Sequence, residues 1–199
     1  MSALRLIVQH VNKLAIGEIF ATRHLLSLAT RAALDQALYR LVKSGFLVRL
    51  ARGVFCKHVE KLKVPTIETI VRAKASAFGK TIAIHGQNAL KALTAFGAKD
   101  ELIQFAWNAK SSSFVVLGVR VYLVGTSMNR VRAGDTKAGL SLRAMSQINK
   151  DSLVPGLIRA MFRRFSQNEL RHFKKQTAPL MTGWMSDIVF HSGIPLGYT

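Results

Sequence analysis

The sequence predicts an α+β fold with a helical tail, and three observations lead to this prediction. Residues 3–44 carry apolar side chains at helical spacing, and two short β runs follow them before residue 58. Helical and β patterns then alternate between residues 66 and 124, and the last third of the chain returns to helical patterns. With 199 residues, 49 % of them hydrophobic, the chain can build one or two domains with a buried core, which excludes a disordered basic tail.

The first helices are marked by apolar spacing and by capping residues. Residues 3–14 are predicted to form an amphipathic helix, and Thr22 is predicted to cap a short second helix. Thr30 can cap a third helix that runs to about Ser44, where Gly45 can end it. The buried stripe of this third helix is expected to consist of Leu34, Ala37, Leu38 and Leu41.

A hairpin pattern comes directly after the third helix. Residues 46–50 and 54–57 are β runs, and residues 51–53 between them predict a turn in which Gly53 supplies the required backbone conformation. Helices followed by a hairpin in this order are typical of a winged helix-turn-helix. We therefore expect residues 1–62 to form such a domain, with a linker over residues 60–65.

Residues 63–199 are expected to form a mixed α/β domain with a helical tail. Helices are predicted at 66–77 and 87–96, with strands at 80–84, 102–107, 114–117 and 119–124, a polar loop at 110–113 and a turn at 134–135. Ser166 and Glu169 form a capping-box pattern that predicts a helix to about Lys175. Pro179 is expected in the first turn of a last helix that reaches Val189.

The charge of the chain points to an anionic partner. Lysine and arginine number 29 against ten acidic residues, so the formal net charge is +19. Fourteen of the basic and four of the acidic residues lie between residues 61 and 150. Such a surplus destabilises a compact chain by self-repulsion unless a polyanion or an acidic protein binds it. We therefore expect a nucleic acid or an acidic protein as the partner, and the alternative is a basic surface that is only solvated.

The compartment expected for the chain is the cytoplasm. Cys56 is the one cysteine, so an internal disulfide is excluded and a reducing compartment is indicated. No window of about 18 apolar residues predicts a membrane span, and the N-terminus carries no signal-peptide pattern. We expect no membrane partner.

The exposed face of the third helix, together with the hairpin, is the candidate DNA-binding surface. In a winged helix-turn-helix, such a helix enters the major groove, where arginine pairs with guanine and glutamine with adenine, while lysine and tyrosine reach phosphates. Arg52 at the hairpin tip would probe the minor groove, and Arg49 would lie near the adjoining DNA backbone. The candidate residues are Arg31, Ala32, Gln36, Tyr39, Arg40, Lys43, Arg49 and Arg52.

Asp35 does not fit this surface, because phosphates repel a carboxylate. It could instead accept a hydrogen bond from a cytosine amino group or position Arg31. The alternative to the whole assignment is an ordinary surface helix in which Arg40 and Lys43 are merely solvated.

The same residues resemble a known family. Residues 33–45 (ALDQALYRLVKSG) and 50–55 (LARGVF) are similar to the N-terminal domain of AbiEi-type antitoxins, and residues 85–90 (HGQNAL) resemble the start of the second domain in related proteins. Phe55 stands where the family usually has tyrosine, and the Thr-Ser-Gly strand end of its second domain is not evident here. The resemblance implies a bacterial transcriptional autorepressor that binds inverted repeats before its own operon. We expect it to be nucleoid-associated and to bind this operator as a dimer or as cooperating monomers. The resemblance also implies an antitoxin against a co-encoded nucleotidyltransferase-like toxin.

Catalysis is not expected from this sequence. Its acidic residues are scattered, its six histidines lack zinc-ligand spacing, and no phosphate-binding loop is present, so we predict no catalytic residue, metal or cofactor. A different class of function stays open, namely an RNA-binding or nucleic-acid-processing protein that uses the basic central region. A third possibility is a protein–protein adaptor that does not bind DNA.

Overall fold

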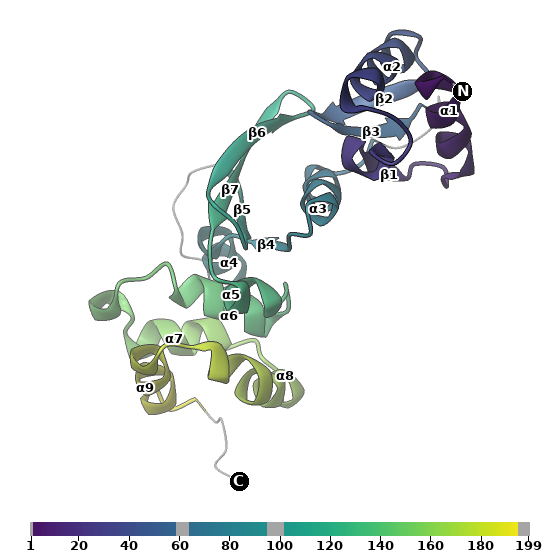
Figure 1. The fold of residues 1–199 in the computed structure, drawn as a ribbon. Coiled ribbons are helices and arrows are strands. Elements are labelled where there is room, and N and C mark those ends of the chain that lie inside the picture. The colour runs from purple at the N-terminus through teal and green to yellow at the C-terminus, as the bar shows by residue number, and fades with distance from the viewer. Residues whose placement is uncertain (1, 59–63, 95–101, 195–199) are drawn as a thin grey trace. The chain divides into compact units, whose positions relative to one another are not determined.

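The computed structural model describes residues 2–58, 64–94 and 102–194, and it confirms a mixed α+β chain (Figure 1). The chain folds into two compact units. Unit 1 comprises residues 1–80 and 113–121, and unit 2 comprises residues 81–112 and 122–199. The domain boundary expected near residue 62, like most of the expected linker, falls among residues 59–63, outside the described part of the chain.

The four helices in the described part of unit 1 lie where the sequence predicts helices, but one predicted capping residue is wrong. They are α1 (Ala3–Lys13), the 3₁₀ helix η1 (Thr22–Leu25), α2 (Arg31–Lys43) and α3 (Ile67–Ala77). Thr30 Oγ1 accepts a hydrogen bond from the Ala33 N–H at 3.5 Å, and Gly45 follows α2 with a φ of +75°. The prediction that Thr22 caps the second helix is wrong. Thr22 is buried as the first residue of η1, and Ala21 is the N-cap.

The strands of unit 1 include the predicted hairpin. β1 (Ile19–Ala21), β2 (Leu47–Ala51) and β3 (Val54–Lys57) pair antiparallel, with β3 between the other two. The turn between β2 and β3 contains Gly53 at a φ of +73°, which favours glycine. β2 also pairs with β6 (Ser112–Val116) through Ala51 and Val116. Ser112 and Ser113 thus belong to a strand, which corrects the polar loop expected at 110–113.

The core of unit 1 lies between α1, α2 and the hairpin. The stripe predicted on α2 is buried as expected, at Leu34, Ala37, Leu38 and Leu41. The other buried members of this cluster are Ile7, Val11, Phe20, Leu25, Leu47 and Phe55. The packed core holds one face of α2 against the unit and leaves its opposite face in solvent.

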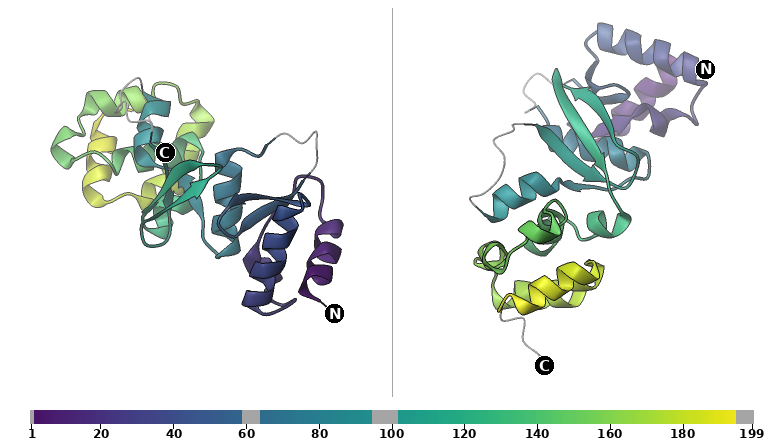
Figure 2. Two further views of the ribbon diagram at one scale, coloured as in Figure 1. Left: turned by 90° about the horizontal axis from the view of Figure 1, so that it is seen from above. Right: turned by 90° about the vertical axis from the view of Figure 1, so that its left-hand side faces the viewer.

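Unit 2 is rich in helices, which are drawn from teal to yellow in Figure 2. Its elements are β4 (Ile82–Ile84), α4 (Gly86–Leu93), β5 (Ile103–Trp107), most of β7 (Val119–Gly125), α5 (Met128–Arg132), α6 (Lys137–Met145), η2 (Lys150–Ser152), α7 (Pro155–Phe162), α8 (Gln167–His172), the π-helical turn η3 (Phe173–Thr177), η4 (Ala178–Leu180) and α9 (Gly183–His191). Among the described residues, strands are hydrogen-bonded in the order β1-β3-β2-β6-β7-β5-β4.

Three helix boundaries in unit 2 differ from the prediction. α8 ends at His172 rather than near Lys175, because the backbone continues as a π-helical turn. Pro179 belongs to η4, and the last helix begins only at Gly183, so the prediction of one helix from Pro179 is wrong. α4 ends at Leu93, before the predicted end at residue 96, because Thr94 follows it in an extended conformation with a φ of −134°.

The core of unit 2 is built by α4, α6, α7 and the elements after them. Phe162 packs against the rings of Phe165 and Phe173 at centroid distances of 4.6 and 4.7 Å. Met145, Ile158 and Val189 are fully buried beside them. The capping box predicted at Ser166 is present, since the Ser166 N–H donates to Glu169 Oε2 at 2.8 Å.

Two helical glycines of unit 2 give a matched test of its packing. A Cβ on Gly139 in α6 would collide with the carbonyl oxygens of Ala133 and Gly134, whereas a Cβ on Gly156 in α7 would meet no atom within 4 Å. We expect Gly139→Ala to lower the free energy of unfolding by about 1–3 kcal/mol through overpacking. Gly156→Ala should leave it unchanged or raise it by about 0.5–1 kcal/mol.

Both tryptophans, Trp107 and Trp184, lie in unit 2, so urea denaturation followed by tryptophan fluorescence reports on this unit. Equal effects of the two substitutions would contradict the packing described for α6.

Candidate nucleic-acid interface

The exposed face of α2 carries the residues that the sequence predicts for DNA contact. Thr30 and Gly45 fix the two ends of α2, and the buried stripe fixes which face turns outward. All eight predicted site residues are exposed: Arg31, Ala32, Gln36, Tyr39, Arg40 and Lys43 on α2, and Arg49 and Arg52 on the hairpin.

Part of this set lines one groove between α2 and the β2–β3 hairpin, which we call the α2 groove. It has a volume of about 320 Å³ and brings together Arg31, Tyr39, Arg49 and Arg52. These residues are up to 21 positions apart in the sequence, so only the fold places them side by side. Ala32, Gln36, Arg40 and Lys43 lie on α2 but do not line the groove.

One carboxylate lies in the α2 groove. Asp35 Oδ2 accepts a hydrogen bond from Arg31 Nε at 2.9 Å, and the two side chains are 55 % and 62 % exposed. This pair corresponds to the second of the two roles considered for Asp35, the positioning of Arg31. Over the described part of the chain, Arg49 and Arg52 form no ion pair with a carboxylate, so the groove keeps a positive surplus.

Sequence reasoning missed Lys74, which belongs to the same unit. Lys74 Nζ donates a hydrogen bond to the Arg52 carbonyl oxygen at 2.7 Å and lies 4.7 Å from the ring centroid of Phe114. Burial, and then the charges of Arg52 and Arg49, lower the pKa of Lys74 from its ordinary value. Chain order assigns α3 to the second domain, and no local signal places Lys74 beside the hairpin.

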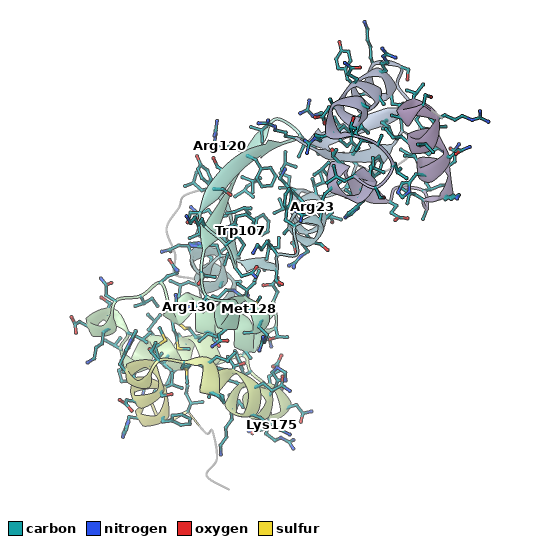
Figure 3. All side chains as sticks on the ribbon, in the orientation of Figure 1. Arg23, Trp107, Arg120, Met128, Arg130 and Lys175 are labelled. Atoms are coloured by element: carbon teal, nitrogen blue, oxygen red, sulfur yellow. The ribbon has the colours of Figure 1, made fainter. Side chains whose placement is uncertain are left out.

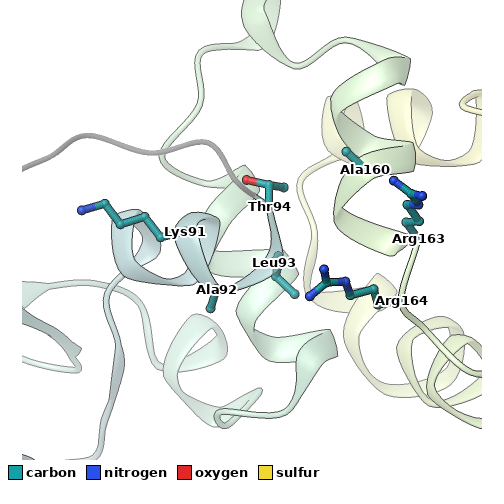
Figure 4. Close-up of a pocket in the computed structure, with 7 residues that line it drawn as sticks. All are labelled: Lys91, Ala92, Leu93, Thr94, Ala160, Arg163 and Arg164. Atoms are coloured by element: carbon teal, nitrogen blue, oxygen red, sulfur yellow. The ribbon is translucent and has the colours of Figure 1, made fainter.

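Unit 2 has a basic hollow of its own, which we call the α4 hollow (Figure 4). It has a volume of about 400 Å³ and is lined by the end of α4 and by α7, with Lys91, Arg163 and Arg164 at its border. These three residues were not among the predicted site residues. Exposed lysines and arginines that belong to no aromatic or glycine-rich motif give little evidence of a binding site in the sequence alone.

Two other ionisable groups are structural. Cys56 is buried in β3, and burial raises the pKa of its thiol, which opposes thiolate reactivity. His85 is buried at the N-cap of α4, where its Nδ1 accepts from the Gln87 N–H at 3.4 Å. Burial lowers the pKa of His85, which keeps the ring in the neutral form that this cap requires.

The described residues contain no metal-binding cluster and no spanning helix. In residues 2–58, 64–94 and 102–194, no three His, Cys, Asp or Glu side chains are grouped so that they could hold a metal ion. None of the helices in that part of the chain has the length and hydropathy needed to cross a bilayer. Comparison of the chain with protein-family models, with curated proteins and with solved structures finds no match.

Proposed function

We propose that the chain is a sequence-specific DNA-binding protein whose first residues form a winged helix-turn-helix. The observation that carries the proposal is the α2 groove, where a capped helix with an exposed polar face lies beside an arginine-bearing hairpin. Three arginines border that groove, and one of them, Arg52, stands at the hairpin turn. Arginine side chains suit both base edges and phosphates.

The residues on α2 and on the hairpin divide the contacts between them. Arg31, Gln36 and Arg40 are exposed on α2 and suit base edges in the major groove. Tyr39 and Lys43 suit phosphates, and Ala32 would lie against the duplex. On the hairpin, Arg49 would contact the DNA backbone and Arg52 would enter the minor groove.

The biological role proposed is that of a cytoplasmic, nucleoid-associated bacterial antitoxin that represses its own operon. Its resemblance to AbiEi-type antitoxins supports this role, with an inverted-repeat operator and a dimer or cooperating monomers bound to it. The basic surplus between residues 61 and 150 suits electrostatic attraction of an acidic toxin of the nucleotidyltransferase-like class.

The test of DNA binding is its dependence on salt. If each protomer neutralises about three to five phosphates and two protomers bind one operator, log K against log salt should have a slope of roughly −5 to −9. A fluorescence titration measures this slope, with the full chain added to a DNA duplex from the promoter of its own operon (the promoter duplex). A slope near zero would remove nucleic acid from the proposal.

Asp35 gives a second expected result. Asp35→Asn removes the carboxylate that repels phosphates and pairs with Arg31, so we expect duplex affinity to rise about two- to fivefold, in line with the small energies of exposed charge pairs. Glu68→Gln is the matched control, because Glu68 forms a similar i,i+4 pair with Arg72 on α3. It should change affinity less than twofold. Weaker binding by Asp35→Asn would assign Asp35 a direct base contact or an essential positioning of Arg31.

A second candidate function is RNA binding through unit 2. The α4 hollow favours it, because Lys91, Arg163 and Arg164 border an open hollow with exposed cations. RNA binding by this route predicts a preference for single strands over an inverted-repeat duplex. Competition between the two nucleic acids for the full chain separates the candidates.

A further inference from the structure

A second hollow lies in unit 1 on the α3 side of the β2–β3 turn, and we call it the α3 pocket. It has a volume of about 230 Å³ and is lined by residues of η1, the turn and α3. Four cations line it: Arg23, Arg31, Arg52 and Lys74. No aspartate or glutamate is among its lining residues in the described chain. The charge of the lining residues therefore favours an anionic ligand.

The lysine of the α3 pocket is held in place rather than free to swing. Lys74 Nζ is fixed by the Arg52 carbonyl oxygen at 2.7 Å and by the face of the Phe114 ring. Burial, and then the neighbouring charges of Arg52 and Arg49, lower the pKa of Lys74 and disfavour its ammonium form. An anion bound between these groups would offset their mutual repulsion. A phosphate, which takes several charge-assisted hydrogen bonds at once, suits such a set.

An aromatic surface lines the same pocket. Phe78 and Leu26 are 50 % and 46 % exposed although both are apolar. The Arg23 guanidinium carbon lies 5.1 Å from the Phe78 ring centroid, and Figure 3 shows Arg23 beside α3. An aromatic ring with an arginine stacked on it is a surface on which a nucleobase packs. The pocket thus joins a phosphate-binding end to a base-stacking end.

We propose that the α3 pocket binds a free nucleotide. Its phosphate contacts Arg31, Arg52 and Lys74, and its base stacks against the exposed surface of Phe78 and Arg23. A volume of about 230 Å³ lies below the roughly 300–1,000 Å³ of pockets that enclose whole drug-sized ligands, so the ligand is one nucleotide, partly open to solvent.

A bound nucleotide would also regulate duplex binding, and this part rests on the proposed function. Arg31 and Arg52 line both the α3 pocket and the α2 groove. A phosphate on one side neutralises the same two guanidinium groups that face the duplex on the other. Nucleotide and duplex therefore compete, even though most of their contacts differ.

The experiment titrates the full chain, free of DNA, with each of the four common ribonucleoside monophosphates in a calorimeter. The four corresponding nucleosides and inorganic phosphate are titrated separately. We expect at least one monophosphate to bind at least tenfold more tightly than its own nucleoside and than inorganic phosphate. Arg23→Gln with Phe78→Ala should weaken that binding at least tenfold, and Arg23→Gln alone at least threefold. The control is Arg5→Gln, which makes the same charge change at an exposed position of α1 in unit 1 and should alter affinity less than twofold. Far-UV circular dichroism checks that each variant is folded.

Three results would overturn the nucleotide site. They are the absence of binding by all four monophosphates, inorganic phosphate binding as tightly as any of them, and equal losses in Arg5→Gln and Arg23→Gln. A saturating monophosphate should also raise the Kd of a promoter duplex severalfold, and an unchanged Kd would overturn the competition. Because the titration uses DNA-free protein, failure of duplex binding leaves its outcome intact, and the two proposals fail separately.

Discussion

Arg143→Met is expected to destabilise unit 2 by roughly 3–5 kcal/mol, which is the range for breaking a buried ion pair. Arg143 is 2 % exposed in α6. Its guanidinium donates to the carbonyl oxygens of Ile84, Arg130 and Gly134 at 2.7, 3.1 and 2.8 Å, and to Asp135 Oδ1 at 2.6 Å. Asp135 Oδ1 also accepts from the Ile84 N–H at 2.9 Å. Methionine fills similar space but donates no hydrogen bond to any of these acceptors.

Urea denaturation followed by tryptophan fluorescence measures this loss, because Trp107 and Trp184 both report on unit 2. Arg143→Lys should also cost stability, since one ammonium cannot reproduce a planar fork that reaches four acceptors. Arg132→Met is the control, an exposed arginine on α5 whose loss should change the free energy of unfolding by less than about 0.5 kcal/mol. Similar midpoints for Arg143→Met and Arg132→Met would refute a structural role for this network.

The role of Arg143 was beyond the reach of the sequence, and the reason is physical. Its partners lie at positions 84, 130, 134 and 135, and three of them are backbone carbonyls, which every residue has. By contrast, α2 could be predicted in detail, because its N-cap, its apolar stripe and Gly45 are local signals that agree with one another. Local agreement of that kind is what makes a helix predictable from sequence.

Unit 1 was predicted less completely than α2 itself. Its β2 pairs with β6 through Ala51 and Val116, which are 65 positions apart, so chain order alone places β6 in the second domain. The basic surface of unit 1 was found only in part, since Arg31 and Arg52 were predicted as contacts but Lys74 and Phe78 were not. Short helices were also placed inaccurately, because Pro179 fits the first turn of a 3₁₀ helix as well as that of an α-helix.

The other large effect is expected from the α2 groove. Replacing Arg31, Arg49 and Arg52 together by glutamine removes the three cations that border it, all of them exposed. Each arginine that reads a base is worth about 1–3 kcal/mol, and each lost phosphate contact lowers the salt slope by about 1. We expect the triple variant to bind a promoter duplex at least 100-fold more weakly than the parent chain, with a visibly shallower slope of log K against log salt.

The matched control removes the same three charges from unit 2, by replacing Lys91, Arg163 and Arg164 with glutamine around the α4 hollow. Both triple variants lower the net charge equally, so general attraction of a polyanion falls equally in the two proteins. Only the local geometry differs between them.

Fluorescence titration of each variant with the promoter duplex, a scrambled duplex and single-stranded RNA then assigns the binding surface. If the unit 2 variant loses duplex affinity as strongly as the α2-groove variant, affinity follows net charge alone and the α2 groove is not the DNA-binding site. If it loses RNA affinity while the duplex is retained, RNA binding resides in the α4 hollow and the two candidate functions occupy different units.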